Sequence, residues 1–387
     1  MCDVLVVGGG LAGWRAAEAV VAAGCSVALV ANGSGNSPDI HALNVPVGPG
    51  DSVELFIADT LRSGQGSCDP ALVEVLCRES VKLADEFPFD RNDDGSYKMI
   101  QPLGCSVPRC VSIDHKIGAW ALAKIKRALA GKVEVVKGRV TALEAGGSQF
   151  TATVSDAQER VPPMVARAVV IATGGWCGKY AFSDNPPELR GDGIALAQSL
   201  GAAVCDLDAV QYEPTVAIAP ERLRGIPVIT TMLHEGATFR NRLGEEFLPD
   251  KHANKDAISR AIRAEIEAGR GIDGGVWYDA TGVPREILET RYADTVRRYA
   301  ACGVDITREP MVVAPAPHTS LGGVAIDAHC RVLRADGTPI PGLFAAGEVT
   351  GGVHGRNRLG GNAGTEVLVF GRIAGESAAQ VREFSCT

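Results

Sequence analysis

The apolar residues of this 387-residue chain form short runs, and the first runs predict alternating strands and helices. Residues 3–7 are a continuous apolar run, which indicates a strand buried on both faces. Residues 11–23 carry the period of a helix, and Gly24 is placed to end it. Residues 26–31 predict a second strand, so the chain opens with a strand, a helix and a strand.

Three glycines with the spacing G-x-G-x-x-G connect the first strand to this helix. Gly8 permits a tight turn, Gly10 lets the backbone approach a pyrophosphate, and Gly13 lets the helix pack on the strand. The pattern predicts a dinucleotide site in a Rossmann-like α/β domain; a glycine turn without a ligand is the alternative. The usual ribose-binding acid after the second strand is replaced by Ala31 and Asn32, although Asn32 can still form a hydrogen bond.

A second place where the sheet would meet a cofactor follows the apolar run at residues 168–173. This run ends in Thr173, and Gly174 follows it, where a strand passes into a glycine turn. Asp192 opens the next predicted helix, and its carboxylate either caps that helix or binds the cofactor.

The character of the sequence changes at about residue 209. Polar turns and two charged helical patterns, at residues 256–268 and 285–302, indicate an inserted domain. Apolar strand patterns resume at residues 311–315 and 322–326, where the chain is expected to return to the first domain.

Charge and cysteine content narrow the possible partners. The formal charge of −8, with Lys and Arg spread along the chain, argues against nucleic-acid binding and favours small molecules. Eleven cysteines without metal-ligand spacing indicate buried thiols in a reducing cytoplasm. Cys105 and Cys110 share the C-x4-C spacing of flavin disulfide reductases, but they lie far beyond the second strand, and no second glycine fingerprint follows. No leader is recognised and no apolar run reaches about 18 residues, so we expect no membrane insertion.

The chain resembles the flavoprotein family of fumarate reductase, succinate dehydrogenase and L-aspartate oxidase, from residue 1 to about residue 380. The segments that carry the resemblance are GGGLAG, ATGG with GDG, QYEPT, KDAISRAIRAEIEAGRG, GVDITREPMVVAPAPHTSLGG and GEVTGGVHGRNRLGGNA. It implies a Rossmann-like FAD-binding domain of the glutathione-reductase type at residues 1–208 and 315–387. An inserted α+β capping domain would span residues 209–314. The implied reaction moves a hydride between flavin and a C=C, CH–CH or CH–NH unit.

The resemblance assigns substrate roles to two residues of the last motifs. His318, in PHTSLGG, matches the family histidine that holds a substrate carboxylate. Arg358, in NRLGGN, matches the arginine that binds a carboxylate near the flavin, a task suited to a planar bidentate donor. Arg356 is an additional cation that either takes part or lies at the surface.

The same comparison assigns cofactor roles. Glu348 matches the acid that holds the FAD ribose. Gly361, Asn362 and Ala363 would bring a helix N-terminus toward the flavin ring, where it stabilises reduced, anionic flavin.

Covalent attachment of the flavin is not expected. Respiratory members bind it through the histidine of an S-H-T motif, and the comparable place here reads Ser37-Pro38-Asp39. Ser37 is still expected to be a cofactor-binding residue. Pro38 cannot form the covalent bond, and His41 lies three residues further on. We therefore expect non-covalent FAD.

Two substrate-side positions depart from the family pattern. Fumarate reductases read H-P-T-G where this chain has Glu213, and an ionised Glu213 would repel a second carboxylate, which argues against fumarate or succinate. Glu213 could instead bind a cationic or hydroxyl group, act as an acid or base if its pKa is raised, or be structural. Lys255 replaces the family's proton-shuttle arginine; it either delivers a proton or is a solvated helix-start residue.

These features favour a two-domain FAD oxidoreductase acting on a small carboxylate-bearing substrate other than fumarate. The alternatives are an amino-acid oxidase or dehydrogenase like L-aspartate oxidase, with Glu213 facing a substrate amine, and a flavoprotein subunit of a larger redox complex. The sequence has no pattern for haem, iron–sulfur or metal binding. Electrons would therefore come from an iron–sulfur or other partner protein, a diffusible donor or oxygen.

Overall fold

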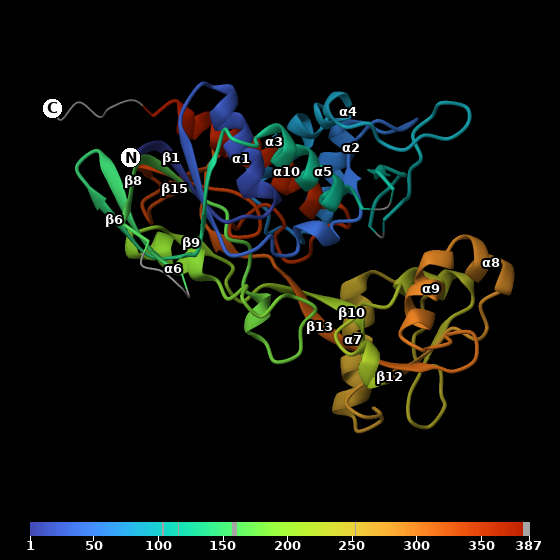
Figure 1. Ribbon diagram of the computed structural model, residues 1–387. Coiled ribbons are helices and arrows are strands. Elements are labelled where there is room, and N and C mark those ends of the chain that lie inside the picture. Colours follow the sequence, from blue (N-terminus) through green and yellow to red (C-terminus); the bar gives the residue numbers. More distant parts are fainter. Residues whose placement is uncertain (103, 115, 157–160, 252, 382–387) are drawn as a thin grey trace. The chain divides into compact units, whose positions relative to one another are not determined.

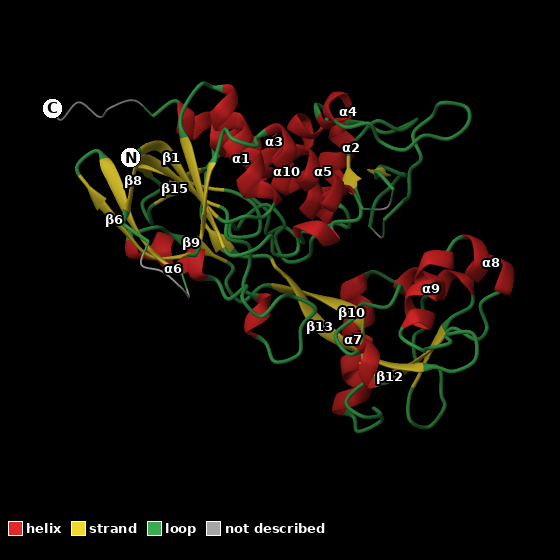
Figure 2. Ribbon diagram, in the orientation of Figure 1, coloured by secondary structure: helices red, strands yellow, loops and turns green. Residues whose placement is uncertain are grey.

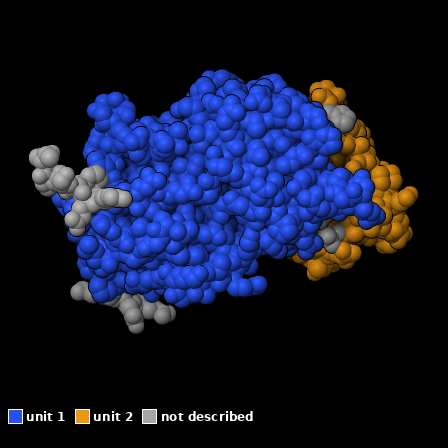
Figure 3. Space-filling view, turned by 90° about the horizontal axis from the view of Figure 1, so that it is seen from above, with its two compact units in different colours: residues 1–179, 186–210, 319–387 blue, residues 180–185, 211–318 orange. Residues whose placement is uncertain are grey.

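The computed structural model describes residues 1–102, 104–114, 116–156, 161–251 and 253–381. The chain divides into two compact units, coloured separately in Figure 3. The first unit comprises Met1–Lys179, Pro186–Val210 and Thr319–Thr387, and the second comprises Tyr180–Asn185 and Gln211–His318. The chain passes from one unit to the other at Tyr180, Pro186, Gln211 and Thr319, so the short segment Tyr180–Asn185 belongs to the second unit.

A mostly parallel sheet forms the centre of the first unit, with β1 between β2 and β8. Strands β1 and β8 are labelled in Figure 1. The last four residues of β1, Val4 to Val7, are almost fully buried, which explains the apolar run. The strand order is β15-β16-β8-β1-β2-β5, and β7 joins the hairpin partner β6 to β8. The strands are β1 (Cys2–Val7), β2 (Val27–Ala31), β5 (Glu134–Lys137), β6 (Arg139–Gly146), β7 (Gln149–Ser155), β8 (Met164–Ile171), β15 (Arg331–Leu333) and β16 (Pro339–Ala345).

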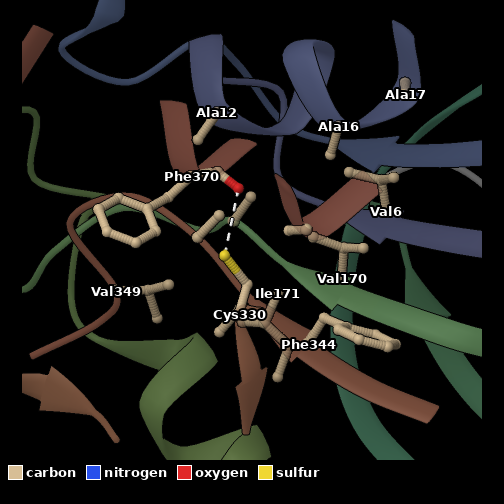
Figure 4. Packing of buried hydrophobic residues seen from close by; sticks show 14 of the residues in the cluster. Val6, Ala12, Ala16, Ala17, Val170, Ile171, Cys330, Phe344, Val349 and Phe370 are labelled. Atoms are coloured by element: carbon tan, nitrogen blue, oxygen red, sulfur yellow. Dashed lines mark hydrogen bonds between the residues drawn. The ribbon is translucent and has the colours of Figure 1, made fainter. Parts of the chain in front are cut away.

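Helices α1 (Leu11–Ala22) and α10 (Asn362–Ala379) pack against each other beside this sheet (Figure 2). A Cβ atom on Gly371 would lie 2.7 Å from the carbonyl oxygen of Ala12, so only glycine allows this approach. Figure 4 shows the core beneath them, where the Cys330 thiol donates to the carbonyl of Phe370 at 3.4 Å. Cys330 is thus a buried core thiol.

Shorter elements complete the first unit. The helices are α2 (Val53–Ser63), α3 (Pro70–Ser80), α4 (Leu83–Glu86), α5 (Ile117–Ala128) and α6 (Asp192–Ser199), with the 3-10 turns η1 (Ser37–Asp39) and η2 (Cys177–Lys179). Two small antiparallel pairs are β3 (Leu43–Asn44) with β4 (Cys110–Val111), and β9 (Val204–Cys205) with β14 (Gly323–Val324). No helix within the described ranges is long and apolar enough to span a bilayer.

The second unit is built on a separate antiparallel sheet with the order β10-β13-β12-β11. Its core is rich in aromatic residues, including the fully buried Tyr278 and Tyr299. Its elements are β10 (Val210–Ala219), η3 (Glu221–Leu223), η4 (Thr230–Glu235), β11 (Thr238–Arg240), α7 (Lys255–Glu267), β12 (Val276–Asp279), α8 (Arg285–Thr290), α9 (Ala293–Ala301) and β13 (Met311–Ser320). The α/β fold with an α+β capping unit is confirmed.

One helix expected from the sequence is divided in two. Residues 285–302 predicted a continuous helix, but α8 ends at Thr290 and α9 begins at Ala293. The intervening Tyr292 has φ −114° and ψ 16°, outside the helical region, and its side chain is buried in the core. Burial of this tyrosine outweighs the helical period of the sequence.

Candidate functional site

Close backbone approaches require glycine both in the turn between β1 and α1 and in the first turn of α1. Gly8 has φ +125°, and a Cβ atom there would lie 2.1 Å from the carbonyl oxygen of Ala172. A Cβ on Gly13 would lie 2.1 Å from the carbonyl oxygen of Gly8, so α1 packs directly on the turn. The predicted strand, turn and helix thus place the N-terminus of α1 where it can face a phosphate.

Three further cofactor candidates lie at or near this turn. Gly10 is the N-cap residue of α1 and offers no capping side chain. The Ser37 hydroxyl accepts a hydrogen bond from the Leu11 backbone N–H at 2.7 Å, which holds η1 against the start of the helix. Asn32 lies exposed just after β2. The structure thus brings Ser37 to the glycine turn and leaves Asn32 at the surface.

The carboxyl end of β8 supplies a buried hydroxyl group. Thr173 Oγ1 is inaccessible to solvent and has no hydrogen-bond partner among the described residues. Gly174 follows with φ +75°. Asp192 is the first residue of α6, where Gly191 occupies the cap position, and its carboxylate pairs with Arg139 at 2.6 Å. Asp192 is therefore not the helix cap.

Glu348 follows β16 and is held by a serine at the end of β13. Its Oε1 atom accepts from the backbone N–H of Ser320 at 2.9 Å and from the Ser320 hydroxyl at 3.0 Å. A Cβ on Gly175 would lie 2.2 Å from the same oxygen. The structure therefore joins Glu348 to the glycine turn after β8, two segments that the sequence assigned separately to the cofactor.

The N-terminus of α10 is fixed by a buried amide network. Gly361, its cap, has φ +88°, a conformation that favours glycine. The fully buried Asn362 side chain accepts from Asn44 Nδ2 at 2.7 Å and donates to Thr60 Oγ1 at 3.2 Å. Ala363 follows in the first helical turn. Asn362 thus positions the helix end, while Asn44 and Thr60, which no spacing in the sequence marks, hold it.

These surroundings fit FAD. The helix N-termini at α1 and α10 favour anionic groups, because their first backbone N–H groups have no partner within the helix. Thr173 Oγ1 and Asn44 Oδ1 are buried without a partner in the described part of the chain, so both retain unused hydrogen-bonding capacity.

The two arginines of the C-terminal motif lie in different surroundings. The Arg356 side chain, 42% exposed, pairs with Asp208 at 2.8 Å and with Asp206 at 3.5 Å. Arg358 is half-buried, and its Nη1 atom donates to the Leu359 carbonyl at 3.3 Å. Burial raises the pKa of the nearby Cys110 thiol, which the charge of Arg358 partly offsets. Cys105 and Cys110 are both free thiols.

In the second unit, Glu213 and Lys255 form an ion pair. Glu213 lies on β10 and is buried, with its Oε1 atom 3.2 Å from Thr230 Oγ1 and 3.4 Å from Thr215 Oγ1. Lys255 opens α7 behind the N-cap Asn254, whose side chain accepts from a backbone N–H of the first turn at 2.9 Å. The ammonium of Lys255 contacts Glu213 Oε2 directly. The two residues that depart from the family pattern, Glu213 and Lys255, are therefore in direct contact.

The charge state of Glu213 follows from these contacts. Burial by itself would raise the pKa of Glu213, but the charges of Lys255 and His318 and the hydrogen bonds from Lys255 and Thr230 outweigh it. The pKa is lowered below its ordinary value of 4.5, so Glu213 is a carboxylate at neutral pH. The sequence-based alternative of an acid with a raised pKa does not hold.

We predict that Glu213→Gln loses stability mainly at neutral pH, by about 1–3 kcal/mol. This is less than for a fully buried pair, because Lys255 is 37% exposed. A lowered carboxylate pKa stabilises the fold above its ordinary value of 4.5, and that contribution disappears as the pH falls through the folded-state pKa. Thermal unfolding from pH 7 to pH 3 should show the gap to wild type closing in acid. Glu221→Gln, at an 84% exposed carboxylate, is the control; a gap independent of pH would contradict the assignment.

His318 lies on β13 and is paired with a residue that sequence reasoning missed. Its Nδ1 atom lies 2.6 Å from Asp184 Oδ2, and the Asp184 side chain is 4% exposed. Asn185 donates to the His318 carbonyl at 2.8 Å. Asp184 lies in a polar stretch before the GDG motif, and only the folding of Tyr180–Asn185 into the second unit brings it to His318.

The first unit combines a mostly parallel sheet with a glycine turn suited to a dinucleotide, and the second is an antiparallel unit that carries a histidine and an acid–lysine pair. Together these features define an FAD-dependent oxidoreductase. Comparison with known families identifies it further: the family described as FAD binding domain matches residues 3–363. The chain belongs to this family, and the resemblance found in the sequence is confirmed.

Relatives within the family include reductases and oxidases. The chain is 35% identical to a subunit of the fumarate reductase (CoM/CoB) of Methanothermobacter marburgensis, over 98% of this chain and 72% of that protein. It is 32% identical to L-aspartate oxidase of Caulobacter vibrioides, over 97% of this chain and 76% of the relative. Among solved structures, a chain of Mycobacterium smegmatis Sdh1 aligns with a TM-score of 0.85 and 30% identity, covering 98% of this chain and 68% of the matched chain.

Proposed function

We propose that this FAD-dependent oxidoreductase transfers a hydride between flavin and a small carboxylate-bearing substrate other than fumarate, at a CH–CH or CH–NH unit. The observation that carries the proposal is the buried, ionised Glu213 paired with Lys255, at the positions where the family pattern has histidine and arginine. When bound, FAD supplies or accepts the hydride at its N5 atom. Glycines 8, 10 and 13, Ser37, Thr173, Gly174, Glu348 and the start of α10 are the residues proposed to hold it.

Substrate binding is assigned to Arg358 and His318. Arg358 has the planar donor pair that suits a carboxylate and is half-buried, whereas Arg356 is more exposed and is paired with two aspartates. His318 is half-buried and is held by Asp184. Arg358 and His318 both match family residues that bind a carboxylate.

Proton transfer is assigned to Lys255, with Glu213 as its partner. The Lys255 ammonium is partly exposed, so solvent can restore a proton that it gives to the substrate atom next to the hydride-accepting carbon. Glu213 holds the ammonium in place and compensates its charge. Removing either side chain should therefore slow the proton step without releasing the flavin.

The charges of the second unit support a substrate with one carboxylate rather than two. Glu213 and Asp184 carry two negative charges there, against Lys255 and a histidine that is neutral or singly positive. This cluster has no surplus positive charge for a second carboxylate, which would be repelled by Glu213.

A second candidate is an amino-acid oxidase or dehydrogenase. The ionised Glu213 favours it, because a buried carboxylate can accept hydrogen bonds from a substrate amine. One relative, 32% identical, is an L-aspartate oxidase. The electron partner is proposed to be an iron–sulfur or other protein, since another relative is one subunit of a fumarate reductase.

The proposed function is tested by mixing small unsaturated acids and amino acids with the FAD-loaded chain in the absence of oxygen. Spectra of the oxidised and the dithionite-reduced flavin are followed without any partner protein. An unsaturated acid that reoxidises the flavin supports the reductase, and an amino acid that bleaches it supports the oxidase. A flavin that responds only after a partner is added would contradict both and support an electron-transfer subunit.

We predict that FAD is held non-covalently. The position of the covalent histidine is taken by Pro38 within η1, and proline has no side-chain nucleophile for the flavin. Acid precipitation should leave the yellow colour in the supernatant. Flavin that remains with the pellet would contradict the prediction, and His41→Ala would then test whether His41 forms the bond.

A further inference from the structure

The His318 ring is held by the segment Tyr180–Asn185 of the second unit. Asp184 Oδ2 lies 2.6 Å from His318 Nδ1, and Asp184 Oδ1 accepts from Asn185 Nδ2 at 2.8 Å. The same Asn185 amide donates to the His318 carbonyl at 2.8 Å, and Ser183 Oγ donates to the carbonyl of Pro317 at 2.8 Å. Both the backbone and one ring nitrogen of His318 are therefore fixed by residues 183–185.

The chemistry of the pair decides where the ring proton lies. An ionised carboxylate can only accept hydrogen bonds, so the nitrogen that faces Asp184 must carry a proton. In the neutral imidazole the second nitrogen, Nε2, then has no proton and can only accept. Nε2 becomes a donor only when the ring takes up another proton from solvent.

Carboxylate binding is the role that the proposed function gives to His318, and the inference rests on that role. We propose that Asp184 is a positioning residue that keeps His318 in the Nδ1–H form, so that His318 can bind a substrate carboxylate only as the imidazolium. Binding then takes up one proton at Nε2, the Nδ1 proton stays with Asp184, and no bond of the ligand is broken.

Two acidic groups of the second unit interact with the ring. Asp184 comes from the segment Tyr180–Asn185, and Glu213 comes from β10, where the charge of His318 helps to lower the pKa of Glu213. Lys255 lies beyond Glu213 as its ion-pair partner. The imidazolium therefore interacts with two carboxylates, Asp184 by direct contact and Glu213 through its charge, and a bound carboxylate would be a third.

A second histidine provides an internal reference. His354 Nε2 lies 3.0 Å from Glu366 Oε2, and its Nδ1 atom is buried without a partner among the described residues. By the same reasoning, neutral His354 should carry its proton on Nε2. The two histidines of one protein are thus expected to be opposite tautomers.

The test is nitrogen-15 NMR of the FAD-loaded chain labelled at its seven histidines, with signals assigned through His318→Gln and His354→Gln. At a pH where both rings are neutral, Nε2 of His318 should give the downfield signal of an unprotonated nitrogen, and in His354 the Nδ1 atom should give that signal. Propionate, a monocarboxylate without a reactive double bond, is then titrated against the His318 signals. In the wild type its affinity should fall by about tenfold per pH unit once His318 is neutral, as the uptake of one proton requires.

Variants at Asp184 separate positioning from simple structural support. In Asp184→Asn the amide can donate to Nδ1, so neutral His318 can carry its proton on Nε2 and the pH dependence of propionate affinity should flatten. Asp184→Glu should retain the wild-type dependence. A neutral wild-type His318 with its proton on Nε2, or a propionate affinity independent of pH, would overturn the proposal. Flavin that exchanges electrons with no acid would contradict the proposed function instead, and the tautomer result would stand.

Discussion

Arg358→Ala is expected to reduce turnover by about 100-fold to 1000-fold or more while FAD remains bound. Removing a positioned donor that meets developing charge in the transition state typically costs this much. The groups proposed to hold FAD lie on other side chains and on backbone, at the glycine turn, Glu348 and the start of α10. Steady-state rates and the flavin content of the purified variant measure the two effects separately.

Arg356→Ala is the matched control, because it removes an identical side chain two residues away. Its guanidinium is exposed and already paired with Asp206 and Asp208, so turnover should change little. An equal loss of turnover in both variants, or normal turnover in Arg358→Ala, would contradict the assignment of Arg358 to substrate binding.

Arg109→Met is expected to destabilise the first unit by about 3–5 kcal/mol, because it removes the cation that contacts the buried Asp51 and leaves the buried Asp59 with the exposed Arg62. Arg109, Asp51 and Asp59 have fully buried side chains, with Arg109 2.8 Å from Asp51 and 3.0 Å from Asp59. The Arg109 guanidinium also lies over the Phe56 ring at 4.8 Å. Thermal or denaturant unfolding of the FAD-free chain measures the loss.

The same variant should weaken FAD binding. Methionine keeps the backbone carbonyl that accepts from the Val45 N–H at 3.1 Å, but loss of the buried ion pairs is expected to displace this segment, which lies next to Asn44, a residue that holds the start of α10. Arg78→Met removes an exposed arginine that pairs with Glu74 and should leave both properties unchanged. An Arg109→Met chain as stable as the wild type would contradict this account of the buried network.

The glycine turn could be predicted because its evidence is local. The spacing of Gly8, Gly10 and Gly13 reflects contacts within one turn, and the structure reproduces the close approaches that it implies. The apolar run of β1 likewise reports burial directly. Such features can be predicted without knowing which distant residues the chain brings into contact.

Partners that are brought together by tertiary folding could not be predicted in this way. Asp184 precedes His318 by 134 residues, and Arg109 meets carboxylates 58 and 50 residues before it, at Asp51 and Asp59. The pairing of Glu213 with Lys255 likewise joins a strand to a helix of the second unit. The sequence shows that Glu213 and Lys255 each depart from the family pattern, but it does not show that their charges form an ion pair.

The most direct test of the central claim is a single-turnover experiment on the isolated, FAD-loaded chain. The chain is reduced with dithionite, freed of excess reductant, and mixed without oxygen with an unsaturated acid selected from the panel. We predict that one molecule of acid is reduced for each flavin reoxidised, with no partner protein present, and that Arg358→Ala leaves the flavin reduced. A flavin that stays reduced until an external electron acceptor is added would contradict hydride transfer to a small acid by this chain.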